Sequence, residues 1–328
     1  MGAMRSSGPR RAVGIAAAIT ATFLAGSAAA EPSTTTPDQG YDLGEMQGAR
    51  GLAMGGAHYA LGTSTSAIYG NPANLPFARV YHLEGLGSMS PEARRTTLGG
   101  AIADSSTSRL AGGLAVNWNM LDPDRVRRSW TDVRMALAFP LADMIAIGAT
   151  GRYLRASQAT QQGPFGASLV SDGTKGEPLF SELTFDAGVT VAPATGLRIG
   201  LVGKNLTNPA TAFAPTLVGG GVGYASSAFS VELGGLADFT TWPQTAGRIM
   251  AGGEVFVIDH VPLRAGYRID TGQKTQSVSL GTGYVDRKWS AEVAGRRDVV
   301  ADHPMTMINL ALRFFYDAGG GQGTEPEL

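Results

Sequence analysis

The chain contains no cysteine among its 328 residues. This absence excludes disulfides, thiolate chemistry and zinc–sulfur sites, and it removes the cysteine to which a lipoprotein attaches its lipid. Beyond the N-terminal segment the sequence also lacks an apolar run of about eighteen residues or more, which argues against a helical membrane protein. Charged residues make up only 16% of the chain, and its mean hydropathy is +0.01. The chain must be held together without disulfides and without a bundle of membrane helices.

The sequence also lacks the motifs of common catalytic and metal sites. No H-x-x-x-H or H-E-x-x-H spacing occurs, and no G-x-S-x-G nucleophile motif is present. Asp259-His260 and Asp302-His303 are the nearest approach to acid–histidine dyads, but both lie in predicted turns. We therefore predict that the protein is not an enzyme, has no catalytic residues, and holds no metal or cofactor. All four histidines are predicted to be ordinary surface or interfacial residues: His58, His82, His260 and His303.

The first thirty residues have the pattern of a secretory signal. Arg5, Arg10 and Arg11 precede a run of small and apolar residues over 12–24, and three alanines end the segment at Ala30. The run is shorter than the roughly 20 residues of a membrane-spanning helix. Cleavage after Ala30 removes three of the 26 basic side chains and none of the 27 acidic ones. The exported chain is then mildly acidic, and no nucleic-acid partner is expected.

From Val80 onward the sequence divides into segments of about ten residues in which apolar positions alternate with polar or small ones. Clusters of Gly, Asp, Asn, Pro and Ser separate these segments. Period-two alternation at this regular spacing predicts fourteen antiparallel strands. The predicted strands are 79–89, 93–103, 108–119, 129–139, 143–155, 180–192, 196–206, 214–224, 228–239, 247–257, 261–270, 275–285, 287–297 and 305–316.

The alternation assigns an apolar face and a charged face to each strand. In one segment Leu197, Ile199 and Leu201 alternate with Arg198 and Lys204. If the apolar face meets lipid, the charges point into a wet lumen, where opposite charges on neighbouring strands can pair. Glycines between them leave space for these large side chains. The predicted lumen-facing charges are Arg152, Asp186, Arg198, Lys204, Glu232, Arg248, Glu254, Arg264, Arg268, Glu292, Arg296 and Arg313.

A soluble β-sandwich would show the same alternation, so other features must decide. The signal peptide implies export, and closing the sheet removes its unpaired edges. The strands are long enough to cross about 25 Å of hydrocarbon when tilted, whereas sandwich strands average about six residues. Aromatic residues gather at strand ends, as in the interfacial girdles of membrane barrels: Tyr81, Trp130, Tyr153, Phe180, Tyr224, Phe239, Trp242, Tyr284, Trp289 and Tyr316. We predict an all-β transmembrane barrel of 12 to 14 strands over 79–316.

Two further segments complete the predicted organisation. The longest break between strands, 157–178, is too long for a periplasmic turn and should be an extracellular loop. Residues 31–78 show no sustained alternation and are interpreted as an N-terminal arm and a plug inside the barrel. Residues 317–328 form a tail beyond the last strand.

The plug carries two recognisable motifs. Residues 48–57 read Gly-Ala-Arg-Gly-Leu-Ala-Met-Gly-Gly-Ala, which includes Met54, Gly55 and Gly56, and Asn71-Pro72-Ala73 follows. A second segment lies in the middle of the predicted barrel. It consists of Asp-Ala-Gly at 186–188 and Gly-Leu-Arg-Ile-Gly-Leu-Val-Gly-Lys-Asn-Leu at 196–206. Together these segments resemble the FadL-type family of outer-membrane transporters and its shorter PorV-like branch, over most of the exported chain. Asn74 departs from the family pattern, which usually has glycine there.

The resemblance implies that 43–76 is a hatch within the barrel and that Asn71-Pro72-Ala73 forms a turn that blocks the lumen. Proline restricts Asn71 to an extended conformation, and asparagine can bond its own local backbone. The alternative is a structural helix stop without a gating role.

Three functions are compatible with this organisation. The first is passive uptake of hydrophobic molecules such as long-chain fatty acids across the bacterial outer membrane. The second is a PorV-like accessory barrel for protein secretion or surface attachment. A plain diffusion pore is the third, and its arginine excess would favour anions. The partners are then the lipid bilayer with a hydrophobic ligand or, for the second function, a secreted protein.

Overall fold

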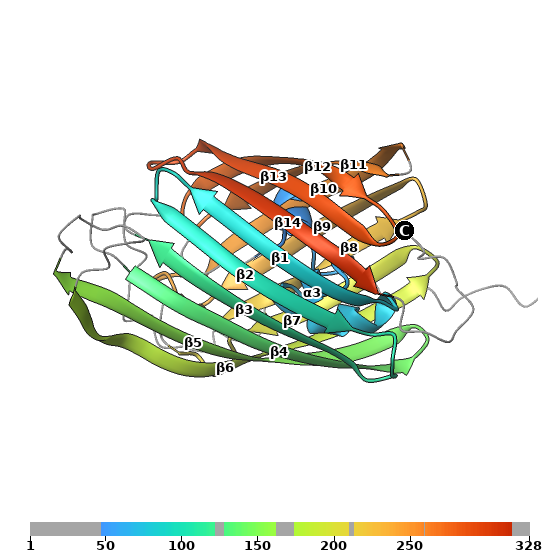
Figure 1. The fold of residues 1–328 in the computed structure, drawn as a ribbon, viewed down its shortest axis with the longest axis horizontal. Helices are drawn as coiled ribbons and strands as arrows, with labels where there is room; N and C mark the ends of the chain where they lie inside the picture. The colour runs from blue at the N-terminus through green and yellow to red at the C-terminus, as the bar shows by residue number, and fades with distance from the viewer. Residues whose placement is uncertain (1–46, 122–127, 162–173, 210–212, 259, 317–328) are drawn as a thin grey trace, which may run out of the picture. The chain divides into compact units, whose positions relative to one another are not determined.

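The computed structural model describes residues 47–121, 128–161, 174–209, 213–258 and 260–316. These residues form fourteen antiparallel strands, each hydrogen-bonded to its neighbours in the chain. The first strand, β1 (Tyr81–Ser90), also pairs with the last, β14 (Thr306–Tyr316), so that Tyr81 lies opposite Tyr316. The sheet closes into a barrel without an open edge (Figure 1). The predicted fourteen-strand antiparallel barrel is confirmed.

The other strands lie close to their predicted positions. They are β2 (Arg95–Asp104), β3 (Ala111–Leu121), β4 (Arg128–Ala142), β5 (Ile145–Gln161), β6 (Thr174–Ala194), β7 (Leu197–Lys204), β8 (Leu217–Ala225), β9 (Phe229–Asp238), β10 (Ala246–Ile258), β11 (Val261–Asp270), β12 (Thr275–Val285) and β13 (Trp289–Val300). The largest difference falls in 157–178, where β5 and β6 extend into the predicted loop. Their pairing continues there through repeated register shifts, which break the period-two pattern that identified the other strands.

The two ends of the barrel differ in their connections. We call the end where β1 begins and β14 finishes the terminal end, and the opposite end the far end. Short turns such as 143–144, 195–196 and 286–288 lie at the terminal end, whereas longer connections such as 205–216 and 239–245 lie at the far end. The ribbon in Figure 1 shows β1 and β14 side by side along the closed wall.

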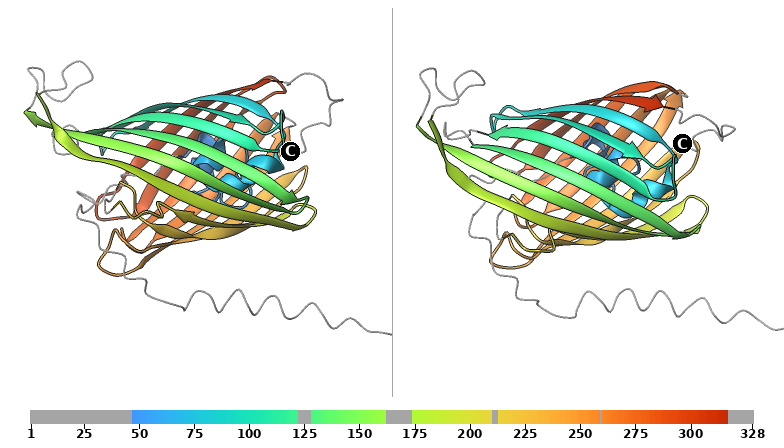
Figure 2. Two further views of the ribbon diagram at one scale, coloured as in Figure 1. Left: turned by 90° about the horizontal axis from the view of Figure 1, so that it is seen from below. Right: turned by 60° about the horizontal axis from the view of Figure 1, so that its bottom comes forward.

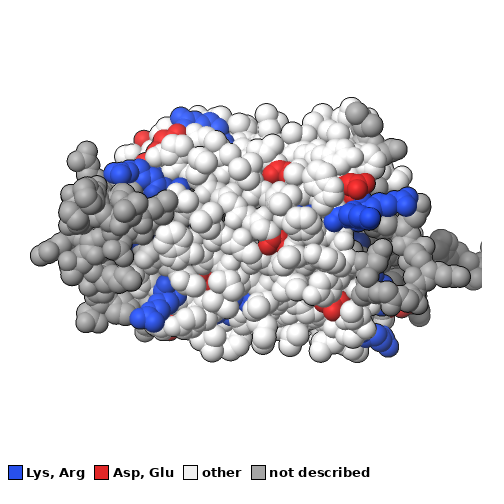
Figure 3. All heavy atoms as spheres, viewed as in Figure 1, with Lys and Arg blue, Asp and Glu red and all other residues white. Residues whose placement is uncertain are grey.

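The outer surface of the barrel is apolar. Leu98, Leu233 and Leu280 point outward and are 56%, 65% and 68% exposed. Lys and Arg side chains gather mainly towards the two ends of the visible face, and its middle is mostly uncharged (Figure 3). A surface of this kind is stable where the surroundings are themselves apolar.

Aromatic side chains form close pairs near the terminal end. Tyr81 and Tyr316 have ring centroids 5.9 Å apart, and those of Tyr284 and Trp289 are 5.4 Å apart. Trp130 was predicted to belong to an aromatic girdle of this kind, and that prediction is wrong. It is only 2% exposed and points into the barrel, because it occupies an inward position of β4.

Residues 47–77 lie inside the barrel. They contain the helices α2 (Ala49–Ala53) and α3 (Thr65–Tyr69) and the 3-10 helix η3 (Pro72–Phe77). Both views of Figure 2 show this blue segment enclosed by the strands. No helix among the described residues is long and apolar enough to cross a membrane. The predicted signal peptide, most of the arm (31–46) and the tail lie outside the described residues.

Candidate functional site: the plugged lumen

The first half of the plug packs against a part of the barrel wall where the inward residues are glycines. Gly252 of β10 and Gly266 of β11 are paired in register and face inward. A Cβ added at Gly266 would lie 2.1 Å from the Gly55 nitrogen, and one at Gly252 would lie 2.5 Å from the Met54 carbonyl oxygen. Gly55 has φ +70°, and its own Cβ would meet the Tyr267 backbone nitrogen at 2.8 Å. The Met54-Gly55 motif is therefore in backbone contact with the wall, which only glycine allows.

The second half of the plug contacts inward glycines in the same way on another part of the wall. Gly148 of β5 and Gly188 of β6 are also paired in register. A Cβ at Gly148 would lie 2.6 Å from the Ala73 nitrogen, and one at Gly188 would lie 2.0 Å from the Asn71 side-chain oxygen. The inward glycines therefore provide docking sites for the plug, in addition to space for neighbouring charged side chains.

Asn71 has the local conformation expected of a residue before proline. Its backbone is extended, with φ −123° and ψ 110°, and its side-chain oxygen accepts a hydrogen bond from the Ala73 N–H at 3.1 Å. Asn71 is thereby the N-cap of η3, while α3 has already ended with Gly70 as its C-cap. The sequence allowed two interpretations of Asn71-Pro72-Ala73, a turn or a helix stop. Both features are present at adjacent residues, because α3 ends at Gly70 and the turn begins at Asn71.

Amide groups then fasten this turn to the wall. The Asn71 side chain donates to the Tyr59 carbonyl and to the Thr190 hydroxyl, both at 3.0 Å. Asn74 donates to the same Tyr59 carbonyl at 3.0 Å and accepts from the Thr190 hydroxyl at 2.6 Å. Both asparagines are fully buried. The residue that departs from the family pattern, Asn74, therefore adds a second link between plug and barrel.

Ion pairs connect the first half of the plug to the wall. Arg50 of α2 pairs with Glu254 at 3.1 Å, and Glu254 also pairs with Arg264. Arg264 reaches across β12 to Glu292 at 2.5 Å, and β12 leaves room because it places Gly281 and Gly283 on its inner face. Burial opposes the charged form of Arg50, but Glu254 and more distant acids outweigh it and raise the pKa of the guanidinium.

The chain of ion pairs continues to the second half of the plug. Arg313 pairs with Glu292 at 2.8 Å and with Glu84 at 3.2 Å, and Glu84 accepts a hydrogen bond from the Thr65 hydroxyl of α3. The network thus links α2 and α3 through the wall strands. Its three carboxylates and three guanidiniums are buried or at most 17% exposed, so their charges neutralise one another within the barrel.

Two further wall residues bind the plug backbone. Glu232 of β9 accepts hydrogen bonds from the N–H groups of Ala60 at 2.7 Å and Leu61 at 2.9 Å. Lys204 at the end of β7 donates to the Tyr69 carbonyl at 2.6 Å. These contacts satisfy backbone groups that regular secondary structure leaves unpaired in this segment.

The remaining predicted lumen charges also lie at the inner wall. Arg152 and Arg134 share Asp132, at 2.7 and 2.9 Å, and Arg248 and Arg268 share Asp270, at 2.6 and 3.4 Å. Arg198 lies over the Phe77 ring at the end of the plug, 4.8 Å from its centroid. Most of the twelve predicted inward charges are thus committed to structural contacts: Arg152, Asp186, Arg198, Lys204, Glu232, Arg248, Glu254, Arg264, Arg268, Glu292 and Arg313.

Two histidines differ from their predicted surface positions. His58 is 2% exposed within the plug, where its ring stacks on Tyr59 with centroids 4.7 Å apart. His82 is at an inward position of β1, where its Nδ1 shares a hydrogen bond with the Ser64 hydroxyl. Their sequence spacing carries no signal of burial, because it depends on how the plug packs. Within the described residues no cluster of His, Asp and Glu could hold a metal ion.

An apolar cluster occupies the lumen at the far end. We call it the mouth cluster, and its large side chains are Leu121, Trp130, Leu154, Phe213, Met305 and Met307. All six are at most 7% exposed, and the rings of Trp130 and Phe213 meet edge to face with centroids 5.0 Å apart. The cluster is continuous with Leu52 and Ala53 of α2. The mouth cluster is thus the apolar part of the lumen that adjoins α2.

Sequence reasoning missed the mouth cluster. Leu154 offered a signal, because it follows Arg152 on the inward face of β5 and is an apolar residue in a charged series. Phe213 and Met305 offered none, since they lie in connections outside the strands. Only the folded barrel brings these connections over the lumen.

The chain matches no protein-family model and no curated protein sequence. Its fold is similar to that of the CymD monoaromatic hydrocarbon channel, with a TM-score of 0.61 and 12% identity over 86% of this chain and 99% of that one. The toluene transporter TbuX of Ralstonia pickettii gives 0.57 and 12% over 84% and 98%, and a Pseudomonas aeruginosa FadL homologue gives 0.57 and 14% over 82% and 98%. At these identities the comparison shows a shared fold.

Proposed function

We propose that the protein is a bacterial outer-membrane channel for passive uptake of small hydrophobic molecules, controlled by the plug. The observation that carries this proposal is the mouth cluster. The inner wall is rich in paired charges, and at the far end Trp130, Leu154 and Phe213 form an apolar cluster beside α2, with Arg95 over the Trp130 ring. Binding sites for small apolar molecules are lined mainly by hydrophobic and aromatic side chains.

The outer surface supports a position in the outer membrane. Closed barrels satisfy every backbone group within the sheet, and the exposed apolar side chains then face hydrocarbon. The aromatic pairs near the terminal end fit an interfacial girdle, and short turns at that end fit the periplasmic side. The far end, with the mouth cluster, then faces the outside of the cell. The predicted signal peptide supplies the export route.

The fold comparison is consistent with this proposal. The similar barrels are a monoaromatic hydrocarbon channel and a toluene transporter, so this barrel architecture is compatible with passage of small apolar solutes. We accordingly include monoaromatic hydrocarbons together with long-chain fatty acids as candidate ligands.

We assign the moving part to α2. The α3–η3 half is attached to the wall by Asn71, Asn74 and Lys204, whereas α2 is attached through one side chain, Arg50, which pairs with Glu254 and donates to Ser230. The α2 helix is also the part of the plug that contacts the mouth cluster. A ligand that parts the cluster displaces α2 and opens a path, while Asn71-Pro72-Ala73 remains docked.

Ligand binding tests the proposal directly. The purified barrel in mild detergent is titrated with toluene and with a long-chain fatty acid while its tryptophan fluorescence is recorded. Trp130 should respond, and the response should be lost in Leu154→Gln, which places a polar amide in the apolar cluster. Leu83→Gln, on the outer wall, is the matched control and should behave as the wild type.

Reconstituted vesicles then test transport. Vesicles that contain the wild-type barrel should take up the same ligand faster than vesicles with the Leu154→Gln barrel. Binding without faster uptake would contradict a channel. An exported protein that co-purifies in stoichiometric amount, with no ligand response, would favour the accessory-barrel function, and a steady anion conductance would favour the diffusion pore.

A further inference from the structure

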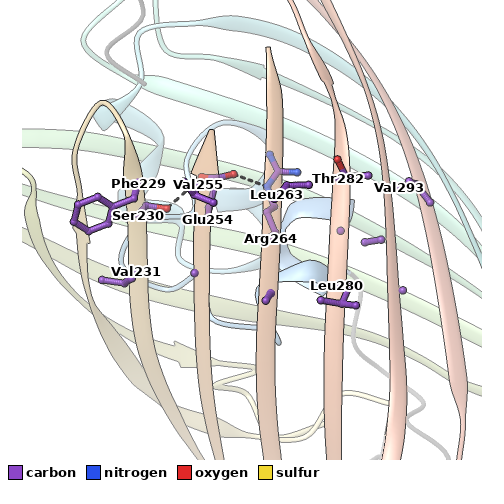
Figure 4. Close-up of a pocket in the computed structure, with 15 residues that line it drawn as sticks. Phe229, Ser230, Val231, Glu254, Val255, Leu263, Arg264, Leu280, Thr282 and Val293 are labelled. Atoms are coloured by element: carbon purple, nitrogen blue, oxygen red, sulfur yellow. Dashed lines mark hydrogen bonds and ion pairs between the residues drawn. The ribbon is translucent and has the colours of Figure 1, made fainter. Parts of the chain in front are cut away.

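The outer wall of the barrel has a hollow across β9 to β13, with a volume of about 780 Å³. This volume lies within the range of about 300–1,000 Å³ that small-molecule sites occupy. Figure 4 shows its lining side chains along five adjacent strands, with Phe229, Val231 and Leu280 among them. These apolar side chains point outward and are 45%, 48% and 68% exposed. The hollow is therefore an apolar depression in the surface that faces lipid.

Small residues in register create the floor of this hollow. Gly253 of β10 lies opposite Ala265 of β11, and Leu280 of β12 lies opposite Gly295 of β13. A Cβ added at Gly253 would meet only ordinary contacts at 3.8 Å or more, and one at Gly295 would have its nearest neighbour at 4.0 Å. Side chains could therefore fit at both positions, and the depression exists because these residues are glycine.

The hollow lies towards the terminal end of the barrel. Phe229 begins β9 there, and Val255 and Thr282 lie near the ends of β10 and β12 at the same side. If the terminal end is periplasmic, as in the proposed function, the hollow faces the inner leaflet of the outer membrane. The aromatic pair Tyr284–Trp289 lies between the hollow and the turn 286–288.

That turn carries positive charge at the position of a lipid headgroup. Arg287 and Lys288 are both exposed, and Asp286 is partly buried, which leaves a net positive turn. From Thr282 to Asp286 the strand rises about 13 Å at about 3.3 Å per residue. A chain in the hollow and a phosphate at the turn are therefore within the reach of one lipid molecule. Arg and Lys bind phosphate through charge-assisted hydrogen bonds.

We propose that this face binds one glycerophospholipid of the inner leaflet, with an acyl chain in the hollow and its phosphate at Arg287 and Lys288. The inference rests on the membrane position in the proposed function. The inner surface of the same wall carries Gly252 and Gly266, on which Met54-Gly55 docks. Lipid and plug therefore contact opposite sides of the same strands, and the lipid supports the wall where paired glycines receive the plug.

Native mass spectrometry of the full barrel, released from nanodiscs of phosphatidylglycerol, tests the lipid site. The wild type should retain one phospholipid under conditions that strip the others. The double variant Gly253→Leu/Gly295→Leu fills the hollow and should lower the ratio of lipid-bound to lipid-free barrel about tenfold, the change expected from losing about two buried methylene contacts. Arg287→Gln/Lys288→Gln should also lower it. The matched control is Gly85→Leu, an outward glycine of β1 with open space around it, and it should retain the lipid.

The outcomes separate the lipid site from the proposed function. Equal retention by the wild type and the filled variant would overturn the proposal, as would a wild-type barrel that retains no lipid. Pairing of two barrels, abolished by the same double variant, would overturn it in favour of an interface between two copies. A wild-type chain that fails to insert into bilayers at all would instead reject the membrane function itself.

Discussion

The two halves of the plug are attached to the barrel in different ways. The α2 half lies on wall glycines, and Arg50 pairs with Glu254 and donates to Ser230, while the Gln47 carbonyl before α2 accepts from Asn309. The α3–η3 half also lies on glycines, but buried amides, a lysine and a carboxylate fasten it in addition. Close backbone contact therefore positions both halves, and the α3–η3 half has more polar links to the wall than α2 itself has. A plug built in this way can open at one end without leaving the barrel.

The largest expected effect comes from a side chain inserted beneath the α2 half. In Gly266→Ala, the new Cβ would lie 2.1 Å from the Gly55 nitrogen and 2.3 Å from the Met54 carbonyl carbon, so the backbone must separate. Overpacking of this kind costs about 1–3 kcal/mol or more. We expect much faster hydrogen exchange in 49–56, with 65–77 nearly unchanged.

The neighbouring outward glycine provides the control for this change. Gly253→Ala adds the same methyl group to the outer wall, where its nearest neighbour is 3.8 Å away. It should leave exchange throughout the plug unchanged. Equal loss of protection in both halves of the plug in Gly266→Ala would show that the plug behaves as one rigid unit, contrary to the comparison.

The next effect concerns the fastened half. Asn71→Ala removes the acceptor of the Ala73 N–H and two donated bonds, although Asn74 still bonds Tyr59 and Thr190. Loss of a buried hydrogen-bond partner costs about 1–3 kcal/mol. Hydrogen exchange should accelerate in 65–77, and ion leakage through reconstituted barrels should rise.

Asn119→Ala controls for the loss of a buried amide. Asn119 is fully buried at the inner wall and accepts a hydrogen bond from the Thr97 hydroxyl, which lies in the wall and not in the plug. The variant should lower barrel stability without raising leakage. If it leaks as much as Asn71→Ala, the asparagines of the plug have no special part in closing the lumen.

The sequence predicted the barrel well because a wall that is apolar outside and carries charges inside enforces strict alternation. In β7 the outward positions hold the apolar residues Leu197, Ile199 and Leu201, and the inward positions hold Arg198 and Lys204. This alternation fixes the register of β7 against its neighbours, because a shift by one residue would turn every side chain to the other face. The extended β5–β6 hairpin escaped prediction because its register shifts break the period. Trp130 was misassigned because an aromatic residue at a strand end fits a girdle and a lumen equally well.

The contacts of the site were harder to predict than its residues. Alternation predicted that the charged side chains point into the barrel. It could not predict their ion-pair partners, because these depend on which strands are neighbours and on where glycines leave space between side chains. Arg264 reaches Glu292 only because β12 places glycines between them. Likewise the sequence around Gly266 gives no sign that this glycine contacts the Gly55 backbone. Such contacts link residues far apart in sequence, and no local pattern records them.

The smallest expected effect tests the single ion pair of α2. In Arg50→Met the plug loses its bond to Glu254, but Glu254 keeps Arg264, so no carboxylate is left without a partner. The cost should therefore be about 1 kcal/mol, well below the 3–5 kcal/mol of an isolated buried charge. We expect modestly faster exchange confined to 49–53, with the melting temperature of the barrel unchanged. Because α2 is the proposed gate, the same variant should take up hydrophobic ligand faster than the wild type. Slower uptake would mean that Arg50 holds α2 in a position that transport requires, and the moving part would have to be sought in the α3–η3 half.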